Sequence, residues 1–313
     1  MKNSIPEVSV IMPVFNRQKY VSDAISSILN QSFTDFEFII VDDGSTDKSY
    51  NLISTYKDSR IKPIKLQKNK GNYYARNLGM NMAVGKYICV MDSDDIALPD
   101  RIQIQHDFME KYKKFGISGS YVKIMNSEEI ITAPVDYDEI KVWSMSNIMF
   151  RHPTVFIRNE FLKKHNLWYN DSYRYAADYD FLAKAAHLFP VTNIDKVLLE
   201  YRKHPEQISS AKRKEQTDIA CIVMLSQLHF FNVKPTEKEN NIHLAFMNRY
   251  PIKSKNEFEE LKTWANFLLE RNLQINSYSP EHLAWFFKSL LKNIYKNFEQ
   301  QYIKEMSVQT LKI

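Results

Sequence analysis

The sequence has few of the residues that mark several large classes of protein. Its two cysteines, Cys89 and Cys221, stand inside apolar stretches, so we expect two buried thiols, no disulfide framework and a reducing compartment. Only six glycines occur in 313 residues, no Gly-x-Gly-x-x-Gly follows the first predicted strand, and no Gly-Lys-Ser/Thr loop is present. Dinucleotide binding of the common kind is therefore disfavoured.

Long hydrophobic runs and strong charge are also missing. No stretch of about 18 apolar residues occurs, so no membrane-spanning helix is predicted, and residues 1–7 lack the pattern of a signal peptide. The formal net charge of +5 is small for this length, which argues against nucleic-acid binding and is compatible with anionic ligands. These absences together predict a cytoplasmic protein.

What the sequence does contain is an alternation of strand and helix patterns, supported by 44% hydrophobic residues. Such an alternation predicts right-handed crossovers and a mostly parallel sheet covered on both faces, an α/β fold. The predicted strands are 8–12, 36–41, 61–66 and 87–91, and the predicted helices are 21–29, 73–83 and 100–115.

The pattern changes after residue 117. Strands predicted at 118–125, 130–132, 153–158 and 197–204, with a helix at 181–188, indicate a smaller antiparallel or mixed addition to the sheet. Beyond about residue 211 strand patterns disappear. Helix starts are signalled by Thr236 with Glu239, by Ser254 with Glu257 and by 279–281, so the tail is predicted to be helical.

Three carboxylates follow the strand predicted at 87–91 within four residues, Asp92, Asp94 and Asp95. Carboxylates this close repel one another and stay ionised together most readily around a cation, so the stretch predicts a divalent-metal site. Ligands of open α/β sheets bind at the carboxyl ends of the strands. A turn or helix N-cap is the alternative for the same residues.

Seven short blocks in this order and spacing resemble the family-2 inverting glycosyltransferases. The blocks are Met12–Asn16, Asn30–Phe33, Val41–Asp47, Ala75–Gly79, Met91–Asp95, Ala177–Phe181 and Tyr201–His204. The resemblance covers about the first 210 residues and implies the GT-A fold. It also implies a division into a catalytic domain, 1–210, with a nucleotide-sugar half at 1–115 and an acceptor half at 116–210, and a C-terminal helical region at 211–313.

The resemblance implies a UDP-sugar donor and an Mn²⁺ or Mg²⁺ ion that neutralises the diphosphate as the glycosidic bond breaks. Asp94 matches the direct metal ligand, and His204 matches a histidine that completes the metal or diphosphate shell. The other residues implied to bind the nucleotide sugar are Pro13, Phe15, Asn16, Asp43, Arg76, Asp92 and Ser93. Among these, Phe15 and Asp43 match the positions that stack on and bond to the base.

Inverting transfer needs a general base for the acceptor hydroxyl, and Asp178 matches the family's base. The family usually has Glu-Asp here, whereas this chain has Ala177 before Asp178. That departure bears on the acceptor class more than on catalysis. His152 matches a position that lines the acceptor pocket, and the implied acceptor is a hydroxyl of a bacterial surface glycan: lipopolysaccharide, capsule or a lipid-linked precursor.

Two questions stay open at this point. An amphipathic stretch at 279–303 combines an apolar row with Lys288, Lys292 and Lys296, which suits either a peripheral contact with an anionic membrane or packing within the protein. A nucleotidyltransferase and a catalytically silent sugar-nucleotide-binding protein are the rival functions. The first would need a basic, glycine-rich loop after the first strand, where this chain has Pro13–Asn16.

Overall fold

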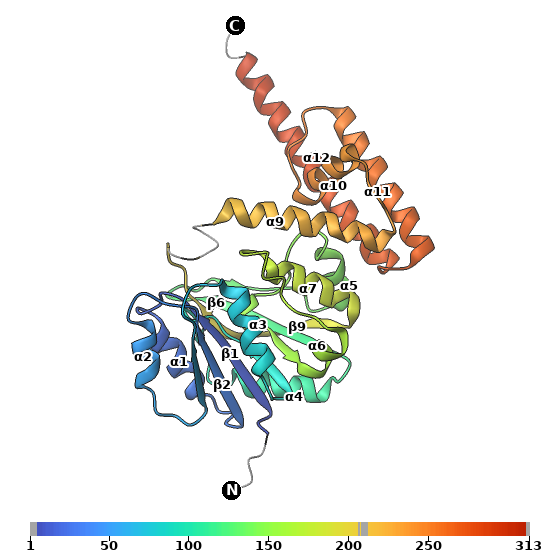
Figure 1. Ribbon diagram of the computed structural model, residues 1–313. Helices are drawn as coiled ribbons and strands as arrows, with labels where there is room; N and C mark the ends of the chain where they lie inside the picture. Colours follow the sequence, from blue (N-terminus) through green and yellow to red (C-terminus); the bar gives the residue numbers. More distant parts are fainter. Residues whose placement is uncertain (1–4, 206, 208–211, 311–313) are drawn as a thin grey trace. The chain divides into compact units, whose positions relative to one another are not determined.

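The computed structural model describes residues 5–205, 207 and 212–310, with side chains as far as residue 300. The chain divides into two compact units, residues 1–140 with 148–216, and residues 141–147 with 217–313. All strands of the described ranges belong to the first unit, as Figure 1 shows.

The first unit is built around one mixed β-sheet with the strand order β3-β2-β1-β4-β8-β6-β9-β5, and β7 pairs with β6. The pairs β1–β2, β2–β3, β1–β4 and β6–β9 are parallel, whereas β8 runs antiparallel to both β4 and β6. The α/β prediction is therefore confirmed. The strands are β1 Val8–Val14, β2 Phe36–Asp42, β3 Ile61–Lys65, β4 Tyr87–Val90, β5 Ile96–Ala97, β6 Ile117–Ile124, β7 Ile130–Ile131, β8 Phe156–Arg158 and β9 Val191–Tyr201.

Helices cover both faces of this sheet, because alternate side chains of each buried strand point to opposite faces. Ile11 of β1 shares a buried cluster with α3 and with Phe181 of α7, whereas its neighbour Val10 shares the other cluster with Ile25 of α1 and Ile102 of α4. The helices are α1 Val21–Leu29, α2 Ser49–Thr55, α3 Asn72–Met82, α4 Arg101–Lys111, α5 Tyr137–Trp143, η1 His152–Thr154, α6 Asn159–His165 and α7 Ala177–Leu188.

Several predicted boundaries are wrong in the second half of the sheet. The strand predicted at 197–204 begins at Val191, because it pairs along β6, and ends at Tyr201, because the Arg202 N–H donates to the Asp95 carboxylate instead of a neighbouring strand. The helix predicted at 181–188 already begins at Ala177, and the one predicted at 100–115 ends at Lys111. The strand predicted at 153–158 begins only at Phe156, because His152–Thr154 form a short 3₁₀ helix.

The second unit contains only helices among its described residues, as predicted for the tail. Thr236 and Glu239 form the predicted reciprocal capping box of α10, and the Ser254 hydroxyl accepts from the Glu257 N–H. Cys221 is partly exposed, so the expectation of a buried thiol is wrong for it, whereas Cys89 is buried. The elements are α9 Arg213–Ser226, η2 Gln227–Phe231, α10 Glu237–Asn248, α11 Lys255–Ile275 and α12 Pro280–Thr310.

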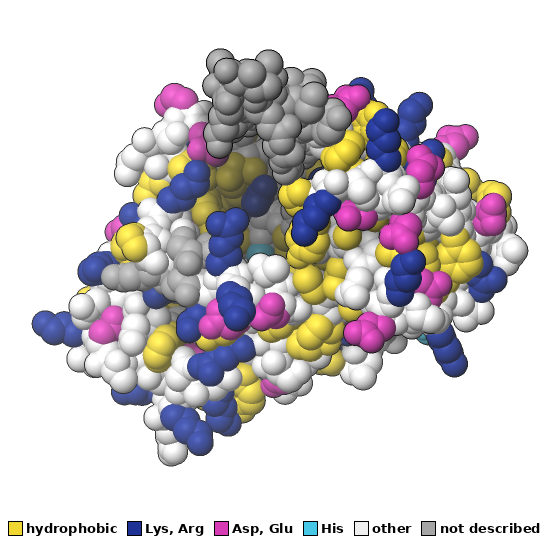
Figure 2. Space-filling model, turned by 90° about the horizontal axis from the view of Figure 1, so that it is seen from above, with side chains coloured by type: hydrophobic (Ala, Val, Ile, Leu, Met, Phe, Trp, Pro, Cys, Tyr) yellow, Lys and Arg dark blue, Asp and Glu magenta, His cyan; other side chains and the backbone are white. Residues whose placement is uncertain are grey.

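The apolar row of α12 is mostly packed inside the helical unit. Phe286 lies against Trp143, which is at the end of α5 and belongs to the second unit, and Phe287 lies against Phe246, with ring centroids 5.0 and 5.2 Å apart. Leu283, Leu290 and Ile294 are also buried. No helix in the described part of the chain is long and apolar enough to cross a bilayer. On the face seen in Figure 2, Lys and Arg side chains are intermixed with Asp and Glu, in keeping with the small net charge.

Candidate active site

A cleft of about 680 Å³ opens where β1, β2 and β4 end. Because these three strands are parallel neighbours, their carboxyl ends meet at one edge of the sheet, and the polar segments that follow them converge there. The predicted site residues that line it are Pro13, Phe15, Asn16, Asp43, Arg76, Asp92, Ser93, Asp94, His152 and Asp178. His204 is not part of this lining, but it contacts Asp94.

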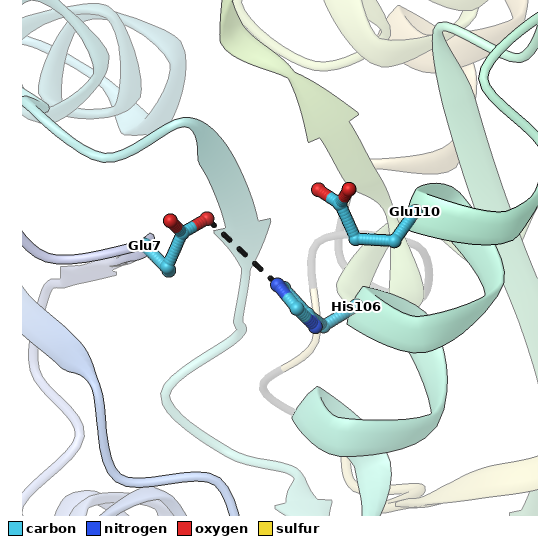
Figure 3. Close-up of side chains that lie close together, drawn as sticks. All are labelled: Glu7, His106 and Glu110. Atoms are coloured by element: carbon cyan, nitrogen blue, oxygen red, sulfur yellow. Dashed lines mark ion pairs between the residues drawn. The ribbon is translucent and has the colours of Figure 1, made fainter.

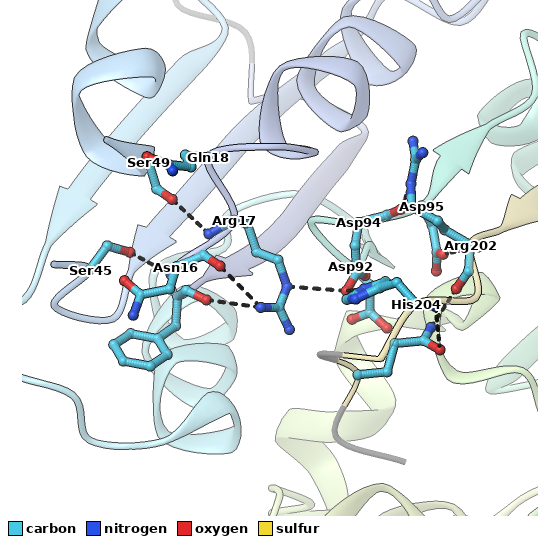
Figure 4. A network of polar contacts seen from close by, with 12 residues as sticks. Asn16, Arg17, Gln18, Ser45, Ser49, Asp92, Asp94, Asp95, Arg202 and His204 are labelled. Atoms are coloured by element: carbon cyan, nitrogen blue, oxygen red, sulfur yellow. Dashed lines mark hydrogen bonds and ion pairs between the residues drawn. The ribbon is translucent and has the colours of Figure 1, made fainter. Parts of the chain in front are cut away.

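The Asp94 carboxylate is the meeting point of three segments of the chain (Figure 4). Its Oδ2 lies 3.0 Å from the His204 Nε2 and 3.1 Å from the Arg17 Nε. His204 follows β9 and stands 110 residues from Asp94 in sequence. The two residues that the sequence assigned to one metal site are therefore in direct contact.

Arg17 is a site residue that the sequence analysis missed. Its guanidinium pairs with Asp94 and also donates to the Asn16 carbonyl at 3.1 Å, and its own N–H donates to the Ser49 hydroxyl at 2.7 Å. The signal available in the sequence was a cationic residue directly after the first block, Met12–Asn16. Arg17 places a positive charge beside the carboxylate that was expected to bind a cation.

Asp95 holds the segment after β9 against the segment after β4. Its Oδ1 accepts the Arg202 N–H at 2.9 Å, and the Arg202 Nε donates to the Asp94 carbonyl at 2.8 Å. These two bonds bring His204, two residues further on, to Asp94. Burial, followed by the charges of Asp94 and Asp92, raises the pKa of Asp95 well above its usual value.

Arg76 is an almost fully buried arginine, 1% exposed, on α3. Its Nη2 donates to the Asp92 carboxylate, whereas Nε and Nη1 have no hydrogen-bond partner among the described residues. Burial is the largest single influence and would lower the pKa of this guanidinium, but the charge and hydrogen bond of Asp92, together with Tyr169 and Tyr73, raise the pKa overall. Arg76 therefore presents a permanent positive charge at the cleft.

The three acids suit a hard divalent cation. Asp92, Asp94 and Asp95 each offer a carboxylate oxygen, and these atoms lie within 4.8 Å of one another. The Asp95 Oδ2 is buried and has no hydrogen-bond partner in the described part of the chain, and burial raises the pKa of Asp92 as well. A cation between these groups would offset both the repulsion and the desolvation, and carboxylate with imidazole is a donor set that Mn²⁺ accepts.

Asp178 lies at the start of α7, where the charge of Arg76 acts on it. Its Oδ1 accepts the Tyr73 hydroxyl at 2.9 Å and the Tyr179 N–H at 3.0 Å. Burial raises the pKa of this carboxyl although both hydrogen bonds and Arg76 act in the opposite direction. A carboxylate with a raised pKa in a cleft can accept a proton near neutral pH.

His152, the predicted acceptor-pocket residue, lies beside Tyr169, an aromatic residue that also contacts Tyr73. Its Nε2 is 2.9 Å from the Tyr169 hydroxyl, and the Tyr169 ring stacks on Tyr73 with centroids 5.5 Å apart. Burial, with the charge of Arg76, lowers the pKa of His152 well below its usual value, so the imidazole is neutral at pH 7.

Comparison with known protein families gives a match over residues 9–170 to the model described as glycosyl transferase family 2. The chain belongs to this family. The matched range takes in β1 to β8 and the whole of the Asp92–Asp95 segment, whereas Asp178 and His204 lie beyond it. The family favours glycosyl transfer over the nucleotidyltransferase alternative.

Curated relatives carry the family match over nearly the whole chain. The chain is 28% identical over 298 residues to an uncharacterized glycosyltransferase of Haemophilus influenzae, covering 90% of this chain and 91% of that protein. It is 32% identical over 239 residues to the putative teichuronic acid biosynthesis glycosyltransferase TuaG of Bacillus subtilis. This match covers 74% of the present chain and 92% of TuaG.

Solved structures similar to this chain share its fold. Residues 1–349 of S. aureus TarS in complex with UDP give a TM-score of 0.62 at 19% identity, covering 95% of this chain and 92% of that one. The mannosyltransferase PcManGT from Pyrobaculum calidifontis, in complex with GDP-Man and Mn²⁺, gives a TM-score of 0.59 at 16% identity. This match covers 95% of the present chain and 88% of PcManGT. The predicted GT-A fold with C-terminal helices is confirmed.

In this family-2 glycosyltransferase, Asp43 is engaged by the loop that precedes α3. Its carboxylate accepts the Lys70 N–H at 2.8 Å, the Gly71 N–H at 2.9 Å and the Asn69 side-chain amide at 2.9 Å. Burial still raises the pKa of Asp43. Asp43 thus anchors this loop beside the cleft, and its predicted bond to a base stays a prediction.

The turn after β2 and the loop after β1 hold each other in place. The Asp42 Oδ1 accepts the Ser45 N–H at 3.0 Å, and the Asn16 Oδ1 accepts the Thr46 N–H at 2.9 Å. Asn16 has a left-handed backbone with φ of 51°, a conformation that asparagine tolerates. Phe15, 39% exposed, stands beside this turn with its ring available for stacking.

A second group of metal-type side chains, Glu7, His106 and Glu110, lies near the start of β4 (Figure 3). Glu110 already accepts from the Lys86 ammonium and from the Tyr87 hydroxyl at 2.7 Å, which lower its pKa to about 2. The His106 Nε2 is 3.8 Å from Glu7. Because Lys86 supplies the positive charge here, the group is a surface ion-pair network, and we assign it no metal.

Proposed function

We propose that this protein transfers a sugar from a UDP-sugar to a hydroxyl of a bacterial surface glycan, with inversion and with an Mn²⁺ or Mg²⁺ ion. The observation that carries the proposal is the contact between Asp94 and His204 at the edge of the sheet where three parallel strands end. A divalent cation that binds a diphosphate can be held by a carboxylate and an imidazole, and the fold brings one of each together here.

The donor assignment rests on the cleft and on the neighbours. TarS has been crystallised with UDP and with UDP-GlcNAc, and the present chain shares its fold. In our proposal Phe15 stacks on the uracil and Asp43 accepts a base N–H. Pro13, Asn16 and Ser93 line the rest of the nucleotide-sugar site.

In our proposal the diphosphate end of the donor binds beside Asp92, Asp94 and Arg76. A divalent cation held by Asp94 and His204 would stabilise the charge that develops on the leaving UDP. Asp92 holds the sugar or ribose, and Arg76 keeps Asp92 in place through their ion pair. Because Nε and Nη1 of Arg76 are buried, Arg76 acts on the donor through its positive charge and through Asp92.

Asp178 acts as general base. In an inverting transfer the acceptor oxygen attacks the anomeric carbon from the face opposite UDP, and its proton must be removed as the new bond forms. Asp178 takes that proton, the glycosidic bond to UDP breaks, and the electron pair leaves with the diphosphate. His152 lines the acceptor side of the cleft as a neutral imidazole.

The acceptor class and the domain roles are proposed from a relative and from the family blocks. TuaG is described by its teichuronic acid biosynthesis, which supports a surface-glycan acceptor here. We assign catalysis to residues 1–210, with donor binding in 1–115 and acceptor binding in 116–210. A peripheral membrane contact through 279–303 would have to use exposed side chains such as Trp285 and Lys288, since most of the apolar row of α12 is buried.

A release assay tests this function without knowledge of the acceptor. The full chain is incubated with a panel of UDP-sugars and Mn²⁺, and the slow formation of UDP by hydrolysis of the donor is measured. We expect one sugar to respond, Asp94→Asn to abolish release, and Asp107→Asn, an exposed carboxylate 64% open to solvent, to leave it unchanged. Equal release by wild type and Asp94→Asn would contradict the metal assignment.

The two rival functions predict different products. A silent binding protein binds UDP-sugars and releases no UDP with any of them. A nucleotidyltransferase instead releases pyrophosphate from nucleoside triphosphates. Asp178→Asn is expected to keep donor hydrolysis and to lose transfer to a panel of p-nitrophenyl glycosides, whereas retained transfer would remove Asp178 from its role.

A further inference from the structure

The two carboxylate oxygens of Asp178 have different surroundings. Oδ1 accepts both the Tyr73 hydroxyl and the Tyr179 N–H, whereas no hydrogen bond to Oδ2 is found among the described residues. Tyr73 is 6% exposed, and its ring is fixed by stacking on Tyr169. The hydroxyl is therefore held in position by packing that does not involve Asp178.

We propose that Tyr73 is the positioning residue of the general base: its hydroxyl holds Asp178 by Oδ1 and leaves Oδ2 to accept the proton of the acceptor hydroxyl. The inference rests on the proposed function, because it assumes that Asp178 is the base. It adds a residue that lies 105 positions away in sequence and that the sequence analysis did not select.

Tyr73 is the donor in this pair, because an ionised carboxylate can only accept a hydrogen bond. Burial, reinforced by the neighbouring Asp178, raises the pKa of Tyr73 well above its usual value, so Tyr73 keeps its proton and donates it in the hydrogen bond. A hydrogen bond donated to a carboxylate favours the ionised form. Tyr73 thus keeps Asp178 available as a base in a site whose burial acts in the opposite direction.

Among the described residues, Tyr169 and three further groups also interact with the Asp178 carboxyl. Arg76 of α3 favours the ionised carboxylate, Asp92 after β4 disfavours it, and Tyr179 donates its N–H from α7 itself. The preceding residue, Ala177, is fully buried and offers no polar atom beyond its backbone. Tyr73 is therefore the neutral side chain whose hydrogen bond can change the pKa of Asp178.

The test is a direct titration of Asp178 in the full chain, with aspartate labelled with ¹³C at the carboxyl and the Asp178 signal identified by its loss in Asp178→Asn. Tyr73→Phe keeps the stacked ring and deletes one oxygen. We expect the pKa of Asp178 to rise by about one pH unit, which is the size of one charge-assisted hydrogen bond. The acid limb of transfer to p-nitrophenyl glycosides should move upward by the same amount.

Tyr74→Phe is the matched control, because the Tyr74 hydroxyl accepts from the Lys70 ammonium at 3.0 Å and does not touch Asp178. It should leave the Asp178 titration and the transfer rate unchanged. Replacing Tyr73 by 3-fluorotyrosine, a stronger donor of nearly the same shape, should lower the pKa of Asp178, and this second variant retains a hydroxyl should Tyr73→Phe fold poorly.

The possible results separate the two proposals. An unchanged Asp178 titration in Tyr73→Phe overturns the positioning role, even if Asp178→Asn abolishes transfer as the proposed function requires. Full transfer by Asp178→Asn overturns the proposed function itself, whatever Tyr73→Phe does to the titration. A rise in Tyr73→Phe with a fall for the fluorinated residue supports the inference.

Discussion

At the scale of single residues, the Asp94 carboxylate shows what sequence can and cannot predict. The dense acids after a strand identify Asp94 as a candidate ligand, and the Tyr-Arg-x-His block identifies His204. Arg17 was not predicted, because a lone arginine in a loop carries no sign of its partner 77 residues away. Tyr73 was not predicted either, because a tyrosine on an amphipathic helix is most often a core residue.

The Arg17 contact leads to a prediction about metal affinity. The guanidinium shares Asp94 Oδ2 with His204, so a divalent cation must displace it to use that oxygen. Arg17→Gln removes a partly buried pair of the kind that contributes up to about 1 kcal/mol, so Mn²⁺ should bind up to about fivefold more tightly. Isothermal titration with MnCl₂ in the absence of nucleotide measures this directly.

Arg60→Gln is a suitable comparison, because Arg60 pairs with Asp58 instead. Its Mn²⁺ affinity should equal that of the wild type. Weaker Mn²⁺ binding in Arg17→Gln would mean that the arginine organises the acids and does not compete with the ion.

At the scale of elements, the local patterns predicted which segments are helix or strand better than they predicted where each one ends. Strands β1 to β4 and helices α1 and α3 agree with the predicted ranges to within a few residues, because alternation and helical spacing are local properties. The start of β9 and the short β5 depend on pairing with distant strands. Local sequence contains no information on those partners.

The approach of α3 to the sheet gives a second prediction. A Cβ at Gly79 would lie 2.6 Å from the Cγ2 of Ile11, a buried residue of β1, so α3 packs closely on this strand only because residue 79 is glycine. Gly79→Ala gains about 1 kcal/mol of helix propensity. Overpacking of a core costs about 1–3 kcal/mol, so we expect a net loss of about 1 kcal/mol in the free energy of unfolding.

Urea denaturation followed by circular dichroism measures this loss. Asn81→Ala, at an exposed position of the same helix, provides the comparison and should be neutral or slightly stabilising. If Gly79→Ala were as stable as Asn81→Ala, the close packing of α3 on β1 would be wrong, and with it the fixed position of Arg76 and Tyr73 on that helix.

At the scale of the whole molecule, the fold explains why the site residues are scattered along the sequence. The cleft takes residues from the ends of β1, β2 and β4, from α3 and from the start of α7, and the tie between Asp95 and Arg202 adds the segment after β9. The sequence predicted the α/β class and ten of the residues that line the cleft. It could not predict how the acids share their hydrogen bonds, because that depends on side chains more than 70 positions apart.

The most direct test of the central claim is the affinity for UDP with and without Mn²⁺, measured by isothermal titration on the full chain. If Asp94 and His204 hold one ion that grips the diphosphate, Mn²⁺ should tighten UDP binding at least about tenfold in the wild type. Asp94→Asn and His204→Ala should lose this gain, and Asp107→Asn should keep it. Wild-type protein that binds UDP equally well with and without Mn²⁺ would contradict the account.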